Sequence, residues 1–195
     1  AILGLMRMRA HPRSRLWAGA ALGLALATAA EGIPLMAAGL MAAGMLWLLR
    51  PADYAKGLGW LGAGIAASLT ILFAALVAPS EWMRPVCDSM GAPFLGVGLV
   101  GGGVAIALVC LPAALTLTIA RRVGSASALG ILGIALLGLL FPACAGGSYS
   151  VLDADVDNLW ISQISEARSL IALSGQDPAM ILATAGAALA GGGTS

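Results

Sequence analysis

Hydrophobic residues form long segments along the chain, and short polar clusters separate them. The apolar stretch 16–49 is too long for one straight membrane helix, because at 1.5 Å per residue it would reach about 50 Å against a hydrocarbon core of roughly 30 Å. Its middle reads AAEGIP, and Glu31 and Pro34 within it predict a break. We therefore expect two short helices, 16–30 and 34–49, hinged at Glu31.

Four further apolar segments follow. Segment 58–78 has the length of one membrane helix, and segment 94–120 returns across the membrane with Pro112 as a predicted kink. Segment 126–141 crosses again, and a last span begins near Asp177. The pattern predicts an all-α polytopic transmembrane helical bundle with about five to six membrane helices, including the short broken hairpin.

Composition supports a membrane protein over a soluble one. The chain is 60% hydrophobic and 10% charged, with a mean hydropathy of +0.97, whereas a soluble domain is about a quarter charged. Abundant Gly and Ala suit helices that pack closely in lipid. No basic and aromatic surface for nucleic acid is visible. The chain begins and ends within apolar sequence, so we expect residues 1–195 to be one transmembrane region inside a longer protein.

Charge is distributed unevenly between the two predicted sides of the membrane. Eight of the ten basic residues fall on one side: Arg7, Arg9, Arg13, Arg15, Arg50, Lys56, Arg121 and Arg122. Eight of the nine acidic residues fall on the other: Glu31, Glu81, Asp88, Asp153, Asp155, Asp157, Glu166 and Asp177. The positive-inside rule makes the basic side cytoplasmic. The sequence thus predicts a multi-pass membrane protein with basic cytoplasmic loops and acidic loops on the outer side.

Three features on the predicted outer side are candidates for function: the hinge at Glu31, the loop around Asp88 and the extracytoplasmic segment 143–176. Because all three belong on one side, we expect them to wall a single cavity. A carboxylate at mid-bilayer costs about 2.5–3.5 kcal/mol by insertion scales, which favours a functional role for Glu31. The alternative is a hydrated carboxylate at the tip of the hairpin, and the sequence leaves both open.

The outer segment begins with FPACAGGSYSVLDADVDNLW, in which Asp153, Asp155 and Asp157 alternate. An EF-hand loop starting at Asp153 needs Gly at its sixth position and Glu at its twelfth. The sequence has Asn158 and Ile164 there, so that motif fails and no metal site is identified. The favoured interpretation is that Asp157 or Asn158 caps an interfacial helix. A divalent cation on these aspartates stays as the alternative.

Two of the three cysteines, Cys87 and Cys144, follow directly on predicted membrane helices on the outer side. A periplasmic location permits oxidation, so we put forward a disulfide between them. Two free thiols are the alternative. A Cα separation beyond about 7 Å would exclude the bridge.

Three segments, GLALATAAEGIPLMAAG, VCDSMGAPFL and FPACAGGSYSVLDADVDNLWISQISEARSL, together resemble the central membrane region of bacterial GT-C glycosyltransferases. The shared pattern is an acid and a Pro between two short helices, a Cys-Asp pair in an outer loop, and a Pro-x-Cys followed by Tyr, Leu-Asp, Trp and Glu-Ala-Arg. The matching positions are Glu31, Pro34, Cys87, Asp88, Pro142, Cys144, Tyr149, Leu152, Asp153, Trp160, Glu166, Ala167 and Arg168.

The resemblance implies sugar transfer from a polyprenyl-phosphate donor at the periplasmic face, by an enzyme or an inactive relative. The catalytic acid of such enzymes lies in a first outer loop that has no counterpart here, so no catalytic residue is assigned. An acceptor or the donor phosphate would contact Arg84 or Arg168, the outward basic residues. Candidate cavity residues are Glu31, Arg84, Asp88, Tyr149, Asp153, Glu166 and Arg168. A transporter or a membrane scaffold without catalytic activity is the alternative.

Overall fold

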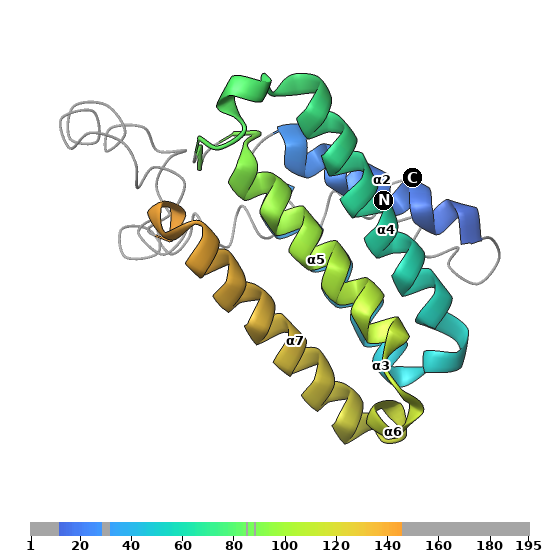
Figure 1. The fold of residues 1–195 in the computed structure, drawn as a ribbon. Helices are drawn as coiled ribbons and strands as arrows, with labels where there is room; N and C mark the ends of the chain where they lie inside the picture. Colours follow the sequence, from blue (N-terminus) through green and yellow to red (C-terminus); the bar gives the residue numbers. More distant parts are fainter. Residues whose placement is uncertain (1–11, 29–31, 85, 88, 146–195) are drawn as a thin grey trace, which may run out of the picture. The chain divides into compact units, whose positions relative to one another are not determined.

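Helices make up every regular element in the described part of the chain, as predicted (Figure 1). The computed structural model describes residues 12–28, 32–84, 86–87 and 89–145, which belong to one compact unit, Ala1–Val151. The elements in chain order are α2 (Pro12–Thr28), α3 (Gly32–Leu49), α4 (Pro51–Leu76), η1 (Pro79–Glu81), α5 (Ala92–Cys110), α6 (Ala113–Thr116), α7 (Ile119–Leu140) and η2 (Pro142–Cys144).

Four of these helices, α3, α4, α5 and α7, are long and apolar enough to cross a membrane. They contain 18 to 26 residues, which corresponds to about 27–39 Å of helix against a hydrocarbon core of roughly 30 Å. By length and composition the chain is therefore a multi-pass membrane protein. Helix α2 is shorter, with 17 residues. The predicted last span and the interfacial helix lie outside the described residues.

The predicted hairpin is present, with α2 ending at Thr28 and α3 beginning at Gly32. A Cβ at Gly32 would collide with the carbonyl group of Ala25, so only glycine permits this close return of the chain. Pro34 lies in the first turn of α3, where its missing N–H leaves no hydrogen bond unmade. The hinge residue Glu31 lies outside the described residues.

Two predicted boundaries are wrong. Segment 94–120 is not one kinked helix: α5 ends at Cys110, because Leu111 before Pro112 is extended at φ −60° and ψ 141°. Helix α7 then begins at Ile119 after a one-turn α6, and the Thr118 hydroxyl accepts a hydrogen bond from the Arg121 backbone N–H at 3.3 Å. Arg121 and Arg122 thus start α7 instead of ending the previous span.

The second wrong boundary is the start of the span predicted at residue 58. Helix α4 begins at Pro51, directly after Arg50, because proline fits the first position of a helix. Asp53 and Lys56 therefore belong to the first two turns of α4 instead of a loop.

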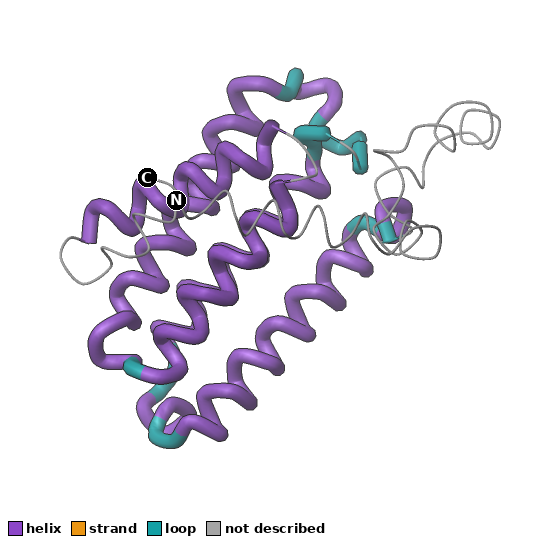
Figure 2. The backbone as a smooth tube through the Cα atoms, turned by 180° about the vertical axis from the view of Figure 1, so that it is seen from behind, coloured by secondary structure: helices purple, strands orange, loops and turns teal. Residues whose placement is uncertain are grey.

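The core forms where α4 packs against α2 on one side and α5 on the other. Glycines allow the backbones to approach: Gly19 of α2 meets Gly64 of α4, and Gly62 of α4 meets Gly102 of α5. The largest fully buried side chains are Leu22, Leu26, Trp47, Leu61, Ile65 and Leu69. Helix α7 runs beside α5 (Figures 1 and 2) and buries only Gly133.

Candidate functional site

A disulfide joins Cys87, in the connection between α4 and α5, to Cys144, just after α7. Their Cα atoms lie 5.5 Å apart, inside the limit of about 7 Å for a bridge. The bridge proposed from the sequence is therefore present. It brings the ends of α4 and α7 and the start of α5 together, and we call this part of the helix bundle the disulfide end.

Of the candidate cavity residues, Arg84 is the one that the structure describes. It lies at the disulfide end, and its Nη1 is 3.2 Å from Oε2 of Glu81. The side chains of the pair are 72% and 48% exposed, and an exposed pair of this kind is worth less than about 1 kcal/mol. Arg84 therefore remains able to exchange Glu81 for another anion. The other candidates lie outside the described residues: Glu31, Asp88, Tyr149, Asp153, Glu166 and Arg168.

The loop that carries Arg84 is held against the end of α4 by Trp82. Its indole Nε1–H donates a hydrogen bond of 2.9 Å to the carbonyl oxygen of Val77, and its ring lies 5.8 Å from that of Phe73. At the other side of the loop Cys87 is buried within the disulfide. The loop thus has two fixed points, and Arg84 lies between them.

Among the described residues, no three His, Cys, Asp or Glu side chains gather closely enough to hold a metal ion. The aspartates for which the sequence left a divalent cation open fall beyond Ala145, outside this part of the chain.

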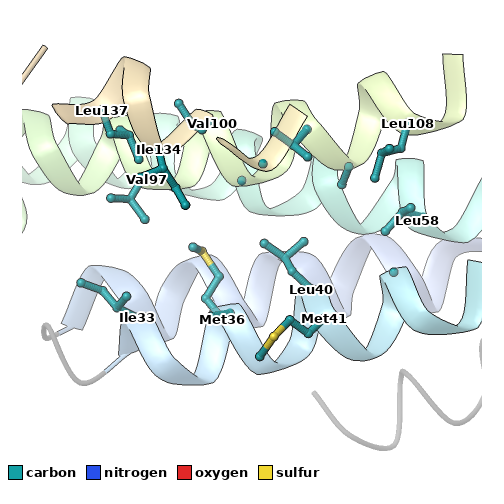
Figure 3. A pocket seen from close by; sticks show the side chains of 16 residues that line it. Ile33, Met36, Leu40, Met41, Leu58, Val97, Val100, Leu108, Ile134 and Leu137 are labelled. Carbon is teal, nitrogen blue, oxygen red and sulfur yellow. The ribbon is translucent and has the colours of Figure 1, made fainter. Parts of the chain in front are cut away.

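An apolar groove opens between α3 and α7, with α5 as its floor (Figure 3). Its volume is about 390 Å³. Ile33 and Leu137 lie at one end of it, and Leu58 and Leu108 lie at the other. The lining contains only aliphatic, methionine and glycine residues: Ile33, Met36, Ala37, Leu40, Met41, Gly44, Leu58, Val97, Val100, Gly101, Val104, Ala105, Leu108, Gly130, Ile134 and Leu137.

The groove exists because α7 is fixed at both of its ends and touches α3 little between them. At its start, Nη1 of Arg122 donates a hydrogen bond to the carbonyl oxygen of Leu48 in α3. At its end, the Phe141 ring packs over Gly96 of α5, next to the disulfide. The groove was not predicted from the sequence, whose one signal for it is the small residues, such as Gly44 and Gly130, that leave the space open.

Four basic side chains that are exposed or half-buried lie at the end of the bundle opposite the disulfide. We call it the basic end, formed by Arg50, Lys56, Arg121 and Arg122. Asp53 is the one acidic residue that the structure describes there. The predicted separation of charges therefore holds along the described helices.

Comparison of the chain with protein-family models, with curated proteins and with solved structures gives no match. The resemblance to GT-C glycosyltransferases therefore rests on the three sequence segments alone.

Proposed function

We propose that this chain is part of an integral inner-membrane glycosyltransferase of the GT-C type, or an inactive relative, that takes a polyprenyl-phosphate-linked sugar at the periplasmic face. The observation that carries the proposal is the convergence of the three resembling segments. Cys87 and Cys144, one from each of two segments, are bonded. The remaining segment, residues 23–39, covers the end of α2 and the start of α3, and its Ile33 lines one end of the groove.

The chemistry of this end suits a lipid with an anionic head. A polyprenyl chain is wholly apolar, and so are the residues that line the groove. Arg84 is exposed at the same end and supplies a bidentate donor for a phosphate. In this proposal the first isoprene units enter between Ile33 and Leu137, and the phosphate stays at the membrane surface beside Arg84.

Orientation follows from the positive-inside rule. The basic end faces the cytoplasm and the disulfide end faces the periplasm, where disulfides persist. Transport is less well supported, because the described spans α3, α5 and α7 contain no acidic residue that would bind an ion at bilayer depth.

The proposal is tested by lipid binding and by transfer. We expect the purified chain in nanodiscs to bind a polyprenyl phosphate more tightly than the uncharged polyprenol of equal length. Arg84→Gln should remove that preference, and Lys56→Gln, at the opposite end, should keep it. Equal binding of the two lipids by the unaltered chain would contradict the proposal. So would transfer rates that stay unchanged in the full-length protein carrying both Arg84→Ala and Arg168→Ala.

A further inference from the structure

The groove continues from the disulfide end toward the basic end, where a different set of residues lines it. On α3 it extends from Ile33 to Gly44, and eleven residues of helix correspond to about 16 Å, or half the hydrocarbon core. Helix α7 contributes lining residues only from Gly130 onward. Near the basic end the walls are Gly44, Leu58 and Leu108, from α3, α4 and α5.

Arginine side chains lie just beyond this part of the groove. Leu48, whose carbonyl oxygen accepts the hydrogen bond from Arg122, follows Gly44 by one helical turn, or about 6 Å along the axis. Arg50 comes directly after α3 and is exposed. The distance from the end of the groove to the arginines is thus short enough for one lipid molecule to reach both.

The described residues do not accept hydrogen bonds from all the N–H groups of Arg122. A guanidinium group has five N–H donors, and Nη1 binds Leu48 while Nε is buried without an acceptor among the described residues. Such an unpaired donor calls for a partner beyond the residues that the structure describes. An oxygen-rich anion would accept hydrogen bonds from the N–H groups that do not bind Leu48.

We propose that an anionic phospholipid binds at the basic end, with its phosphate on Arg50 and Arg122 and one acyl chain in the groove along Gly44, Leu58 and Leu108. The exposed and half-buried side chains Arg50, Lys56, Arg121 and Arg122 outnumber Asp53 and make the surface of this end positively charged. A basic pocket between membrane helices is the usual place for an anionic head group. Its head group lies at the opposite end from the polyprenyl-phosphate site, and the two proposals share only the apolar groove.

Two other occupants fit less well. A soluble phosphate would accept hydrogen bonds from the arginines, but it has no apolar part to fill the groove. A second copy of the chain would bring its own basic end against this one, and like charges would repel. Of these three occupants, only the phospholipid joins an anion to an apolar chain.

Native mass spectrometry of the purified full-length chain with two lipids of identical acyl chains tests the proposal. We expect dioleoyl-phosphatidylglycerol to stay bound when dioleoyl-phosphatidylcholine has dissociated. Each of Arg50→Gln and Arg122→Gln should weaken phosphatidylglycerol binding by about fivefold. Lys56→Gln removes one charge from the same end without altering either arginine and should weaken it less.

A second pair of variants tests the groove. A Cβ at Gly44 or at Gly138 would meet no atom within 4 Å, so both positions have open space where a side chain would begin. Gly44→Leu places its side chain at the groove and should displace the acyl chain, whereas Gly138→Leu on α7 should leave lipid binding unchanged. The Cys87–Cys144 bridge, read on a non-reducing gel, reports that each variant has folded.

Three results would overturn the proposal. Equal retention of the two lipids would show that the chain does not select the anionic head group and contacts both only as bulk lipid. Loss of phosphatidylglycerol in Arg84→Gln but not in Arg50→Gln would move the anion site to the disulfide end. Unaltered binding in a folded Gly44→Leu variant would show that the acyl chain lies elsewhere. Should Arg122→Gln fail to fold, the exposed Arg50 still decides the charge question.

Discussion

Gly62 of α4 and Gly102 of α5 lie in backbone contact at the centre of the bundle. A Cβ on Gly62 would be 2.5 Å from the carbonyl oxygen of Gly102, and a Cβ on Gly102 would be 2.6 Å from that of Gly62. Because both neighbouring atoms belong to backbones, neither can move without shifting a helix. This contact sets the spacing of α4 and α5, and α5 is the floor of the groove.

Adjacent glycines should therefore respond to alanine in opposite directions. Gly102→Ala should lower the free energy of unfolding by about 1–3 kcal/mol, because the methyl group overpacks the crossing. Gly103→Ala, where a Cβ meets no atom within 4 Å, should raise it by up to about 1 kcal/mol through helix propensity. Unfolding of both variants in mixed detergent measures the difference, and equal effects would argue against the close crossing.

How much of the fold the sequence predicts depends on the kind of signal at each boundary. The return between α2 and α3 was predictable because Glu31, Gly32 and Pro34 interrupt an apolar stretch with charge, flexibility and a missing N–H. The break after Cys110 was not, since the residues that follow Pro112 are as apolar as a membrane helix. There the extended backbone at Leu111 ends α5 and the Thr118 cap begins α7. The hydropathy of the segment indicates neither feature.

In the candidate site, too, the sequence predicts one feature and not another. Cys87 and Cys144 could be paired from the sequence because each comes shortly after a predicted span, and the two spans end on the same side of the membrane. The groove could not be predicted, because it depends on the angle between α3 and α7. That angle is set by contacts between residues far apart in the chain, such as Arg122 with Leu48. Local patterns contain no information on such pairs.

Removing the disulfide should loosen α7. The bridge closes a loop with a sequence separation of 57, for which the chain-entropy model gives about 4 kcal/mol and engineered cases give less. We expect Cys87→Ser, Cys144→Ser and the double variant to lower the free energy of unfolding by a similar amount, about 2–4 kcal/mol. Cys110→Ser, at the free and exposed cysteine, is the control. A double variant much less stable than either single one would show that the thiols act separately.

Arg15 should tolerate an apolar replacement. Its side chain is 5% exposed, it packs over Gly57, and its Nε has no acceptor in the described part of the chain. A buried charge without full pairing contributes little net stability, and an apolar group of similar length often replaces it at no cost. Arg15→Met should keep the free energy of unfolding within about 1 kcal/mol, whereas Arg15→Ala should lower it by leaving a void. A large loss in Arg15→Met would reveal a partner for the guanidinium.

The disulfide end and the basic end should lie on opposite sides of the membrane. In a Cys110→Ser background the two remaining native cysteines are bridged, so one introduced cysteine is the single target of a membrane-impermeant maleimide. Met83 is 92% exposed at the disulfide end, and Lys56 is exposed at the basic end. We expect Met83→Cys to react in intact cells and Lys56→Cys to react only after lysis.

Two independent physical reasons lead to this expectation. The positive-inside rule retains the basic end in the cytoplasm, and an oxidising compartment favours the disulfide at the opposite end. If Lys56→Cys reacted from outside and Met83→Cys did not, the disulfide would face a reducing cytosol. Arg84 would then be unable to meet a sugar donor at the periplasmic surface, and the glycosyltransferase proposal would lose its binding site.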